Sequence, residues 1–285
     1  MGVGPGGRGG RITVEDWEVA RDGGGSVIWQ DGKIRREAPL CVPPAHVEGV
    51  MTTVGCDGGR VLLWEMHRQR LLGFPGLVVE ESVLPQPQDL ESLLEASGCL
   101  APSRLRVSVW RDSSTGTVRV EAVCSPLKAC GPGQKPVWLA VVRWEDPPEA
   151  GHKVIARHRW HDAGERSVAW GGDDALAVGY EGRLLETSKA NIFVRRGSVV
   201  VTPPAPARCL PGIMRQVVLE TLPSVGLKVE EKDVFLDELT FADEIWITNA
   251  VAGIVRVGRV GERIWDSWPF HRRLVTMSIP APGWP

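Results

Sequence analysis

Residues 186–215 read ETSKANIFVRRGSVVVTPPAPARCLPGIMR, and this stretch decides the fold. It opens with the carboxylate of Glu186, and residues 191–202 form two β-favouring runs joined by a turn, which predicts a hairpin. After Gly212 the apolar residues recur every three or four positions, which predicts a helix over residues 214–222. A glycine at the start of a helix lets backbone N–H groups approach an anion, and the helix dipole adds attraction.

Local patterns outside this stretch predict further strands and helices. Asp31-Gly32 is a dipeptide typical of tight turns, and the runs around it, residues 27–34, favour a hairpin. The other expected elements are a buried strand over residues 61–64, helices over residues 65–72 and 89–96, an antiparallel pair over residues 105–110 and 117–123, and a strand over residues 137–144. Hairpins mixed with isolated helices indicate an α+β fold rather than a doubly wound parallel sheet.

Chain-breaking residues divide the sequence into expected domains. Residues 131–136 are rich in glycine and proline and form the best linker. They separate an expected small N-terminal α+β domain, residues 26–130, from an expected larger C-terminal domain, residues 137–285. Residues 1–25 are glycine-rich, and we expect them to form a flexible N-terminal extension.

The composition is that of an ordinary soluble protein, with 43% hydrophobic and 24% charged residues among 285. A net charge of -2 with scattered basic residues argues against a nucleic-acid partner. No apolar run approaches the roughly 20 residues that span a bilayer, and no signal peptide is evident, so we expect no membrane association. The six cysteines form no Cys-x-x-Cys pair, so we expect reduced thiols, a cytoplasmic location and no metal site.

The order of a carboxylate, an Asn-opened hairpin and a Gly-Ile helix start resembles the pyridoxal-phosphate enzymes of the branched-chain-aminotransferase superfamily, known as class IV or fold type IV. The resemblance covers residues 26–260 and implies a two-domain α+β architecture. A small N-terminal α/β domain would join a larger, cofactor-binding C-terminal domain with a pseudo-barrel. It also implies pyridoxal 5'-phosphate as the cofactor, a small-molecule substrate and a homodimer.

Two further motifs resemble segments that hold the cofactor in this family. Residues 152–157 read HKVIAR and resemble the His-Lys-x-x-x-Arg segment of aminodeoxychorismate-lyase-like members, although relatives often carry Thr and Asn within it. This implies that Lys153 is the catalytic lysine and holds the cofactor as a Schiff base. His67-x-x-Arg70-Leu71 resembles the motif whose arginine grips the cofactor phosphate. The other cofactor-binding residues that the resemblance implies are Glu186, at the pyridine nitrogen, and Leu210, Gly212, Ile213, Thr248 and Asn249.

Each of these residues also has a simpler interpretation. A lone lysine is usually solvated, a helix arginine often makes only a surface ion pair, and a carboxylate at a strand end is usually exposed. The order of the motifs along the chain, rather than any single residue, favours the functional interpretation.

The substrate side resembles the family less closely. Relatives carry Asp-Arg and Gly-Asp-Gly patterns before a Phe-Glu-Thr strand, whereas residues 44–53 retain only the glycine and the pair of threonines. Thr52 is a candidate substrate-binding residue. Arg111, which follows the predicted strand over residues 105–110, is a candidate for binding a substrate carboxylate, and the alternative is an exposed hairpin arginine.

Three segments resemble aminodeoxychorismate lyases more than aminotransferases: Met51-Thr52-Thr53, Gly212-Ile213-Met214 and Asn249-Ala250. Aminotransferases of this fold use tyrosines near the substrate, and the only tyrosine here, Tyr180, lies in a predicted surface turn. We therefore predict a lyase that converts 4-amino-4-deoxychorismate to 4-aminobenzoate and pyruvate, as in folate biosynthesis. The alternatives are a class IV aminotransferase acting on a D-, branched-chain or unusual amino acid, and a degenerate, non-catalytic relative.

Overall fold

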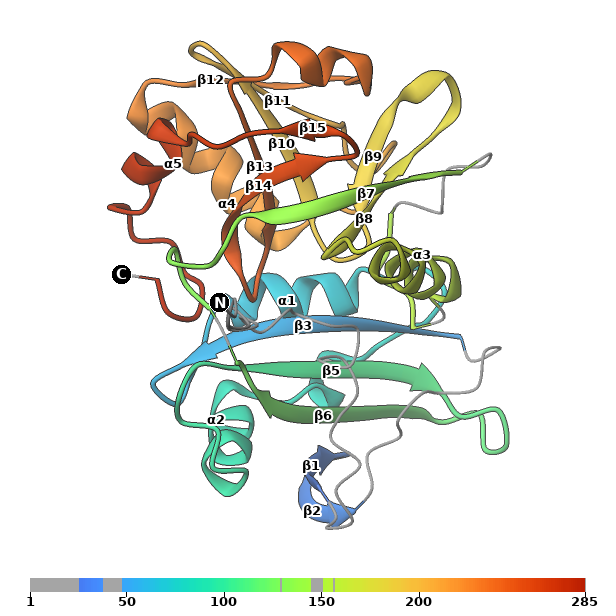
Figure 1. Cartoon of the computed structure of the whole chain (residues 1–285). Coiled ribbons are helices and arrows are strands. Elements are labelled where there is room, and N and C mark those ends of the chain that lie inside the picture. The colour runs from blue at the N-terminus through green and yellow to red at the C-terminus, as the bar shows by residue number, and fades with distance from the viewer. Residues whose placement is uncertain (1–25, 38–47, 129, 145–150, 156, 285) are drawn as a thin grey trace, which may run out of the picture.

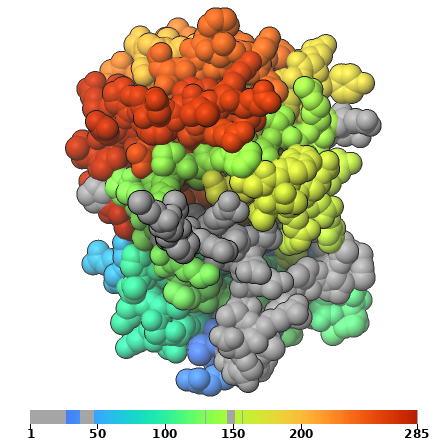
Figure 2. Space-filling model, in the orientation of Figure 1, coloured from blue at the N-terminus to red at the C-terminus, as the bar shows by residue number. Residues whose placement is uncertain are grey.

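The strands form two sheets, one from each half of the chain (Figure 1). The computed structural model describes residues 26–37, 48–128, 130–144, 151–155 and 157–284. The predicted extension over residues 1–25 lies outside this part of the chain. The space-filling view shows the same division, with the second half of the chain at the top and the first half below it (Figure 2).

The first sheet is antiparallel and has the strand order β2-β1-β6-β5-β3-β4. Its strands are β1 (Ser26–Gln30), β2 (Lys33–Glu37), β3 (Gly49–Asp57), β4 (Arg60–Val61), β5 (Ser103–Arg111) and β6 (Val118–Pro126). The hairpin predicted around Asp31-Gly32 is confirmed, because both turn residues have positive φ, 44° and 85°, as a tight hairpin turn requires. The antiparallel pair predicted over residues 105–110 and 117–123 is also confirmed.

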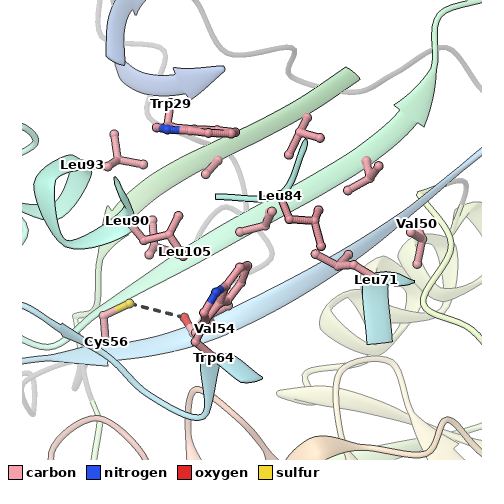
Figure 3. Close-up of a cluster of buried hydrophobic side chains, with 14 of the residues drawn as sticks. Trp29, Val50, Val54, Cys56, Trp64, Leu71, Leu84, Leu90, Leu93 and Leu105 are labelled. Carbon is pink, nitrogen blue, oxygen red and sulfur yellow. Dashed lines mark hydrogen bonds between the residues drawn. The ribbon is translucent and has the colours of Figure 1, made fainter. Parts of the chain in front are cut away.

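Helices α1 (Trp64–Leu72) and α2 (Pro87–Ala96) contribute to an apolar core on one face of this sheet. Alternate residues of β3 point into it, and Figure 3 shows Val50 and Val54 among its side chains. Because side chains alternate along a strand, Thr52 lies on this core face, while Met51 and Thr53 lie on the opposite one. The two faces of β3 therefore have different surroundings.

The strand predicted over residues 61–64 is wrong in part. β4 contains only Arg60–Val61, and α1 already begins at Trp64. Leu63 adopts a left-handed φ of 54° and turns the chain into the helix. A short apolar run does not distinguish a strand from a turn followed by a helix.

The second sheet is mixed and has the order β12-β11-β10-β13-β14-β7-β8-β9, with β15 paired to β14. Its strands are β7 (Val137–Arg143), β8 (Asp174–Val178), β9 (Leu184–Thr187), β10 (Asn191–Arg196), β11 (Val199–Thr202), β12 (Lys228–Glu231), β13 (Glu244–Asn249), β14 (Gly253–Val260) and β15 (Arg263–Ile264). The remaining helices are α3 (His158–Ala169), α4 (Ile213–Thr221), α5 (Pro269–Leu274) and the 3-10 helices Glu81–Val83, Tyr180–Gly182, Leu222–Val225 and Asp237–Phe241. None of the helices in the described residues is long and apolar enough to cross a membrane.

The α+β prediction is confirmed, as are the hairpin β10-β11 and the helix α4 that residues 186–215 predicted. Helix α3 was not predicted. The predicted domain limits at residues 130 and 137 stay a prediction. In Figure 1, α1 and α3 lie at the level where the two halves of the molecule meet.

Candidate active site

Lys153 lies at the edge of the first sheet, although it belongs to the second half of the chain. Its backbone carbonyl accepts a hydrogen bond of 2.8 Å from the N–H of Met51 in β3. Two residues on, the N–H of Ile155 donates to the carbonyl of Gly49 at 3.1 Å. The Nζ of Lys153 donates to Thr53 Oγ1 at 3.0 Å. Backbone and side chain together therefore fix this lysine on β3.

The surroundings of Lys153 favour its neutral form. Burial is the main cause, and the charges of Arg157 and Arg70 add to it, so that the pKa of Lys153 lies well below its usual range. The carboxylate of Glu186 opposes this effect. A lysine with a lowered pKa is a better nucleophile and general base near neutral pH.

Glu186 is the buried carboxylate of the site. It lies in β9 with 4% of its surface exposed, and its Oε2 accepts hydrogen bonds from the N–H of Leu210 at 3.1 Å and from Asn191 Nδ2 at 3.3 Å. Burial raises the pKa of Glu186 to about 7, although Arg157 and the Leu210 N–H act in the other direction. A cationic group placed beside Glu186 would stabilise its charged form.

Asn191 fixes the loop that leads to α4. Besides Glu186, its Nδ2 contacts the carbonyl of Leu210 at 2.8 Å. A Cβ atom on Gly212 would lie only 2.0 Å from Asn191 Oδ1, so this position has no room for a side chain. One amide therefore holds both the carboxylate and the loop before the helix.

No side chain among the described residues caps the N-terminus of α4. The helix starts at Ile213, and its N-cap, Gly212, is extended. The first N–H groups of a helix have no partner within it. Arg70 Nη2 donates to the carbonyl of Pro211 at 2.6 Å, which brings the guanidinium to this end of the helix. Burial and the nearby Arg157 lower the pKa of Arg70 to about 10.

Thr248 supplies a further polar atom beside this loop. It lies directly opposite Asn191 in the β10-β13 pair and is 1% exposed. Its Oγ1 is buried and has no hydrogen-bond partner among the described residues. Such a hydroxyl is costly unless it is bonded. A phosphate group requires several hydrogen-bond donors. The Thr248 hydroxyl, the uncapped N–H groups of α4 and the Arg70 guanidinium are donors of this kind, so these residues fit pyridoxal phosphate.

Thr52 and Arg111 are not brought to Lys153. Thr52 is fully buried, and its Oγ1 lies 2.5 Å from His67 Nδ1 in α1, so it faces the core. The neighbouring Thr53 contacts the lysine instead. Arg111 is exposed and donates to the carbonyl of Gly116 within its own hairpin.

Asn249 has a local role in the turn after β13. Its Oδ1 accepts hydrogen bonds from the N–H groups of Val251, at 3.0 Å, and Ala252, at 2.8 Å. The side chain therefore shapes the turn that follows Thr248. Its contact with a cofactor stays a prediction.

Two arginines whose charges lower the pKa of Lys153, Arg157 and Arg104, were missing from the predicted set, as was Arg106 on the same sheet face. Arg157 was quoted only as part of a motif, and it interacts with the charges of Lys153, Arg70 and Glu186. Its guanidinium lies 5.2 Å from the ring centroid of Trp160. Arg106 lies opposite Thr53 in the β3-β5 pair, so both side chains are on the face away from the core. The alternation of apolar and polar residues in this strand was the available signal for Arg106.

Comparisons with known proteins agree with this fold. A family model described as amino-transferase class IV matches residues 49–260, well over half of the chain. A hypothetical aminotransferase from Mycobacterium tuberculosis, solved in its PLP-bound form, superposes with a TM-score of 0.76 at 17% identity, covering 87% of this chain and 95% of that one.

Curated relatives match over shorter segments. Branched-chain-amino-acid aminotransferase 1 of Arabidopsis thaliana, a mitochondrial protein, is 40% identical over 75 residues, which are 26% of this chain and 20% of the relative. Aminodeoxychorismate lyase of Vibrio harveyi is 34% identical over 87 residues, 30% of this chain and 32% of the relative. The chain thus matches between a fifth and a third of the length of these two relatives.

Proposed function

Because the chain belongs to the amino-transferase class IV family, we propose that it is a pyridoxal-phosphate-dependent lyase that converts 4-amino-4-deoxychorismate to 4-aminobenzoate and pyruvate. Pyridoxal phosphate is the cofactor of this family. The observation that carries the choice of lyase concerns Tyr180, the only tyrosine in the chain, which is 74% exposed in a surface turn. A tyrosine-lined substrate site, as in the aminotransferases of this fold, is therefore not available within this chain. The lyase-like Met214 and Asn249-Ala250 support the same choice.

In this proposal the cofactor is held at three points. Lys153 would bind it covalently, and Glu186 would face its pyridine nitrogen. A positive charge on that nitrogen would lower the raised pKa of the Glu186 carboxyl. Its phosphate would be bound by the α4 N-terminus, Arg70 and Thr248. Leu210 lies next to Glu186 and Asn191 and would lie beneath the ring. When bound, the cofactor withdraws electrons from the amine-bearing carbon of the substrate.

The side chains of this protein then move protons. Lys153 would be released when the substrate amine replaces it on the cofactor, and its freed neutral amine would remove the proton from the amine-bearing ring carbon, which its lowered pKa allows. The bond between the ring and the enolpyruvyl oxygen breaks, and the ring becomes aromatic. The same proton returns to the methylene carbon of the leaving group, from Lys153 directly or through the Thr53 hydroxyl that its Nζ contacts. Atoms balance without any acceptor, because the substrate divides into 4-aminobenzoate and pyruvate alone.

Arg106 is our candidate for a substrate carboxylate, in place of Arg111. It is partly buried, lies opposite Thr53, and is therefore on the same sheet face as the hydroxyl that contacts Lys153. A guanidinium binds a carboxylate through two parallel hydrogen bonds. Arg106→Ala should raise KM more than it lowers kcat, because the contact is present before and during the reaction.

A class IV aminotransferase is the second candidate. Branched-chain aminotransferases predominate among the curated relatives, as the proteins from Arabidopsis thaliana and Thermotoga maritima illustrate. Lyase and aminotransferase would share every cofactor-binding residue named above. A homodimer and a cytoplasmic location stay predictions.

One assay separates the two candidates. Purified protein loaded with cofactor is given 4-amino-4-deoxychorismate without any keto acid, and both products are measured. The lyase forms pyruvate and 4-aminobenzoate in equal amounts over many turnovers. Failure to form pyruvate, together with amino transfer from a branched-chain or D-amino acid to a keto acid, would establish the aminotransferase instead.

A further inference from the structure

Residues 281–284, which we name the strap, lie at the side of the molecule, at the level where its two halves meet (Figure 1). One end contacts the turn after β13: the indole N–H of Trp284 donates to the carbonyl of Ala252 at 3.2 Å. Gly253, in the same turn, has a φ of 69°, and a Cβ atom there would lie 2.3 Å from Trp284 Nε1. The tryptophan ring therefore packs directly on the backbone of this turn.

The strap also contacts the end of β3. The N–H of Gly283 donates to Asp57 Oδ2 at 2.8 Å. At Gly55 a Cβ atom would lie 2.4 Å from the carbonyl oxygen of Ala250 and 2.6 Å from Pro282 Cδ. Because Gly55 has no side chain, the turn after β13 and the strap can both pack against the end of β3.

Both structures that the strap joins carry residues of the candidate site. The turn is closed by Asn249 and directly follows Thr248, whose buried hydroxyl lacks a partner among the described residues. β3 carries Thr53, two residues before Gly55, and Thr53 contacts Lys153. Movement of the turn away from β3 would separate the hydroxyl of Thr248 from the lysine side of the site.

We propose that the strap determines how long the cofactor is retained, with Trp284 and Asp57 as positioning residues that hold the turn at residues 249–253 against β3. The inference rests on the proposed function, because the retained group is the phosphate of the cofactor beside Thr248. Loss of either anchor should loosen the turn and speed cofactor release. One hydrogen bond corresponds to a change of about threefold to tenfold in rate.

The experiment measures cofactor release from the reconstituted holoprotein. Pyridoxal phosphate is bound to each variant, and the holoprotein is mixed with an excess of an unrelated apoprotein that traps the free cofactor. The two proteins are separated after increasing times, and the visible absorbance that remains on the variant is measured. The test variants are Trp284→Leu and Asp57→Leu. Asp57→Asn keeps an acceptor for the Gly283 N–H and should behave as the wild type.

Trp268 provides a matched control. Its indole N–H also donates to a backbone carbonyl of β14, that of Val257, at 3.2 Å, but away from the turn. Trp268→Leu removes the same atoms and the same kind of bond. It should lower the thermal midpoint of the apoprotein and leave the release rate unchanged. If Trp284 has only a structural role, Trp284→Leu and Trp268→Leu should release the cofactor at the same rate.

The expected result is release three to ten times faster in Trp284→Leu and Asp57→Leu, but not in Trp268→Leu or Asp57→Asn. If Trp284→Leu does not fold, Asp57→Leu decides alone. Wild-type release from Asp57→Leu, or equally fast release from Trp268→Leu, overturns the proposal. Arg70→Ala shows whether the strap proposal or the proposed phosphate site has failed. If only Arg70→Ala releases the cofactor faster, the strap proposal alone is rejected. If release is unchanged in all variants, both are rejected.

Discussion

Lys153 and Thr53 are separated by 100 residues in the sequence, yet Lys153 Nζ donates a hydrogen bond of 3.0 Å to Thr53 Oγ1. The adjacent Thr52 points to the other face of β3, where its hydroxyl lies 2.5 Å from His67 Nδ1. Two neighbouring threonines thus have separate contacts, one with the amine of Lys153 and one in the core.

Replacing each threonine by valine in turn should separate a role of Thr53 in activity from a role of Thr52 in stability. Thr53→Val should lower kcat by about 100-fold, the lower range for a group that assists proton transfer, with little effect on folding. Thr52→Val should leave kcat nearly unchanged and destabilise the protein by about 1–3 kcal/mol, because the buried His67 nitrogen loses its partner. Product formation and urea unfolding are the measurements. An equal loss of kcat in both variants would contradict the assignment.

Glu186→Gln should retain the cofactor and lose activity. The neutral amide can still accept the hydrogen bond from the Leu210 N–H, but it no longer stabilises a positive charge on the pyridine nitrogen. We expect kcat to fall on the order of 100-fold, as when one preorganised electrostatic partner is removed. The ratio of bound cofactor to protein, read from absorbance, should stay that of the wild type. A wild-type kcat would place Glu186 outside the chemistry.

Arg70→Ala should weaken cofactor binding more than it slows the saturated enzyme. A charge-assisted hydrogen bond contributes about 1.5–3 kcal/mol, which corresponds to roughly a 10- to 100-fold rise in Kd. Equilibrium titration of the apoprotein with pyridoxal phosphate measures this change. Arg70→Lys is the matched control and should recover part of the affinity, since it keeps the charge but not the forked geometry. Identical Kd values for Arg70→Ala and the wild type would exclude the phosphate contact.

The pH dependence of apoprotein stability tests the environment of Lys153. Its pKa is lowered on folding, so the unfolded chain binds more protons in the range between the lowered value and the ordinary one. In that range the wild-type apoprotein should gain stability as pH rises. Lys153→Met has no amine that must lose a proton on folding, so its stability advantage over the wild type should be largest at the low-pH end of that range and should shrink toward about pH 10. Urea unfolding of both apoproteins at several pH values measures this, and an advantage that grows with pH would have the wrong sign.

Much of the fold could be predicted because local signals were strong. Asp31-Gly32 dictates a tight turn whatever lies around it, and the hairpin after Asn191 has two clear β-favouring runs. The run at residues 61–64 misled, because Leu62 and Leu63 are apolar residues in a turn. Helix α3 was missed because its buried face combines one large apolar residue, Trp160, with the small or polar residues Ala163, Gly164 and Ser167, so few large apolar residues marked the helical spacing.

The site could be predicted only where it resembled known motifs. Lys153, Arg70 and Glu186 were predicted in this way; the structure brings their charges within interaction range, and their roles stay predictions. Whether Thr52 or Thr53 contacts Lys153 is determined by which face of β3 is buried. The position of Arg106 opposite Thr53 is determined by the register of β3 against β5. Pairing register is a long-range property that a single sequence does not state.

Attachment of the cofactor to Lys153 can be measured directly. The holoprotein is reduced with borohydride, which makes the attachment permanent, then digested and analysed by peptide mass spectrometry. We predict the added pyridoxyl mass on the peptide that contains Lys153, and its absence from the peptides of Lys153→Ala. Its appearance on another lysine such as Lys189, or on no peptide of a protein that binds the cofactor, would contradict the account.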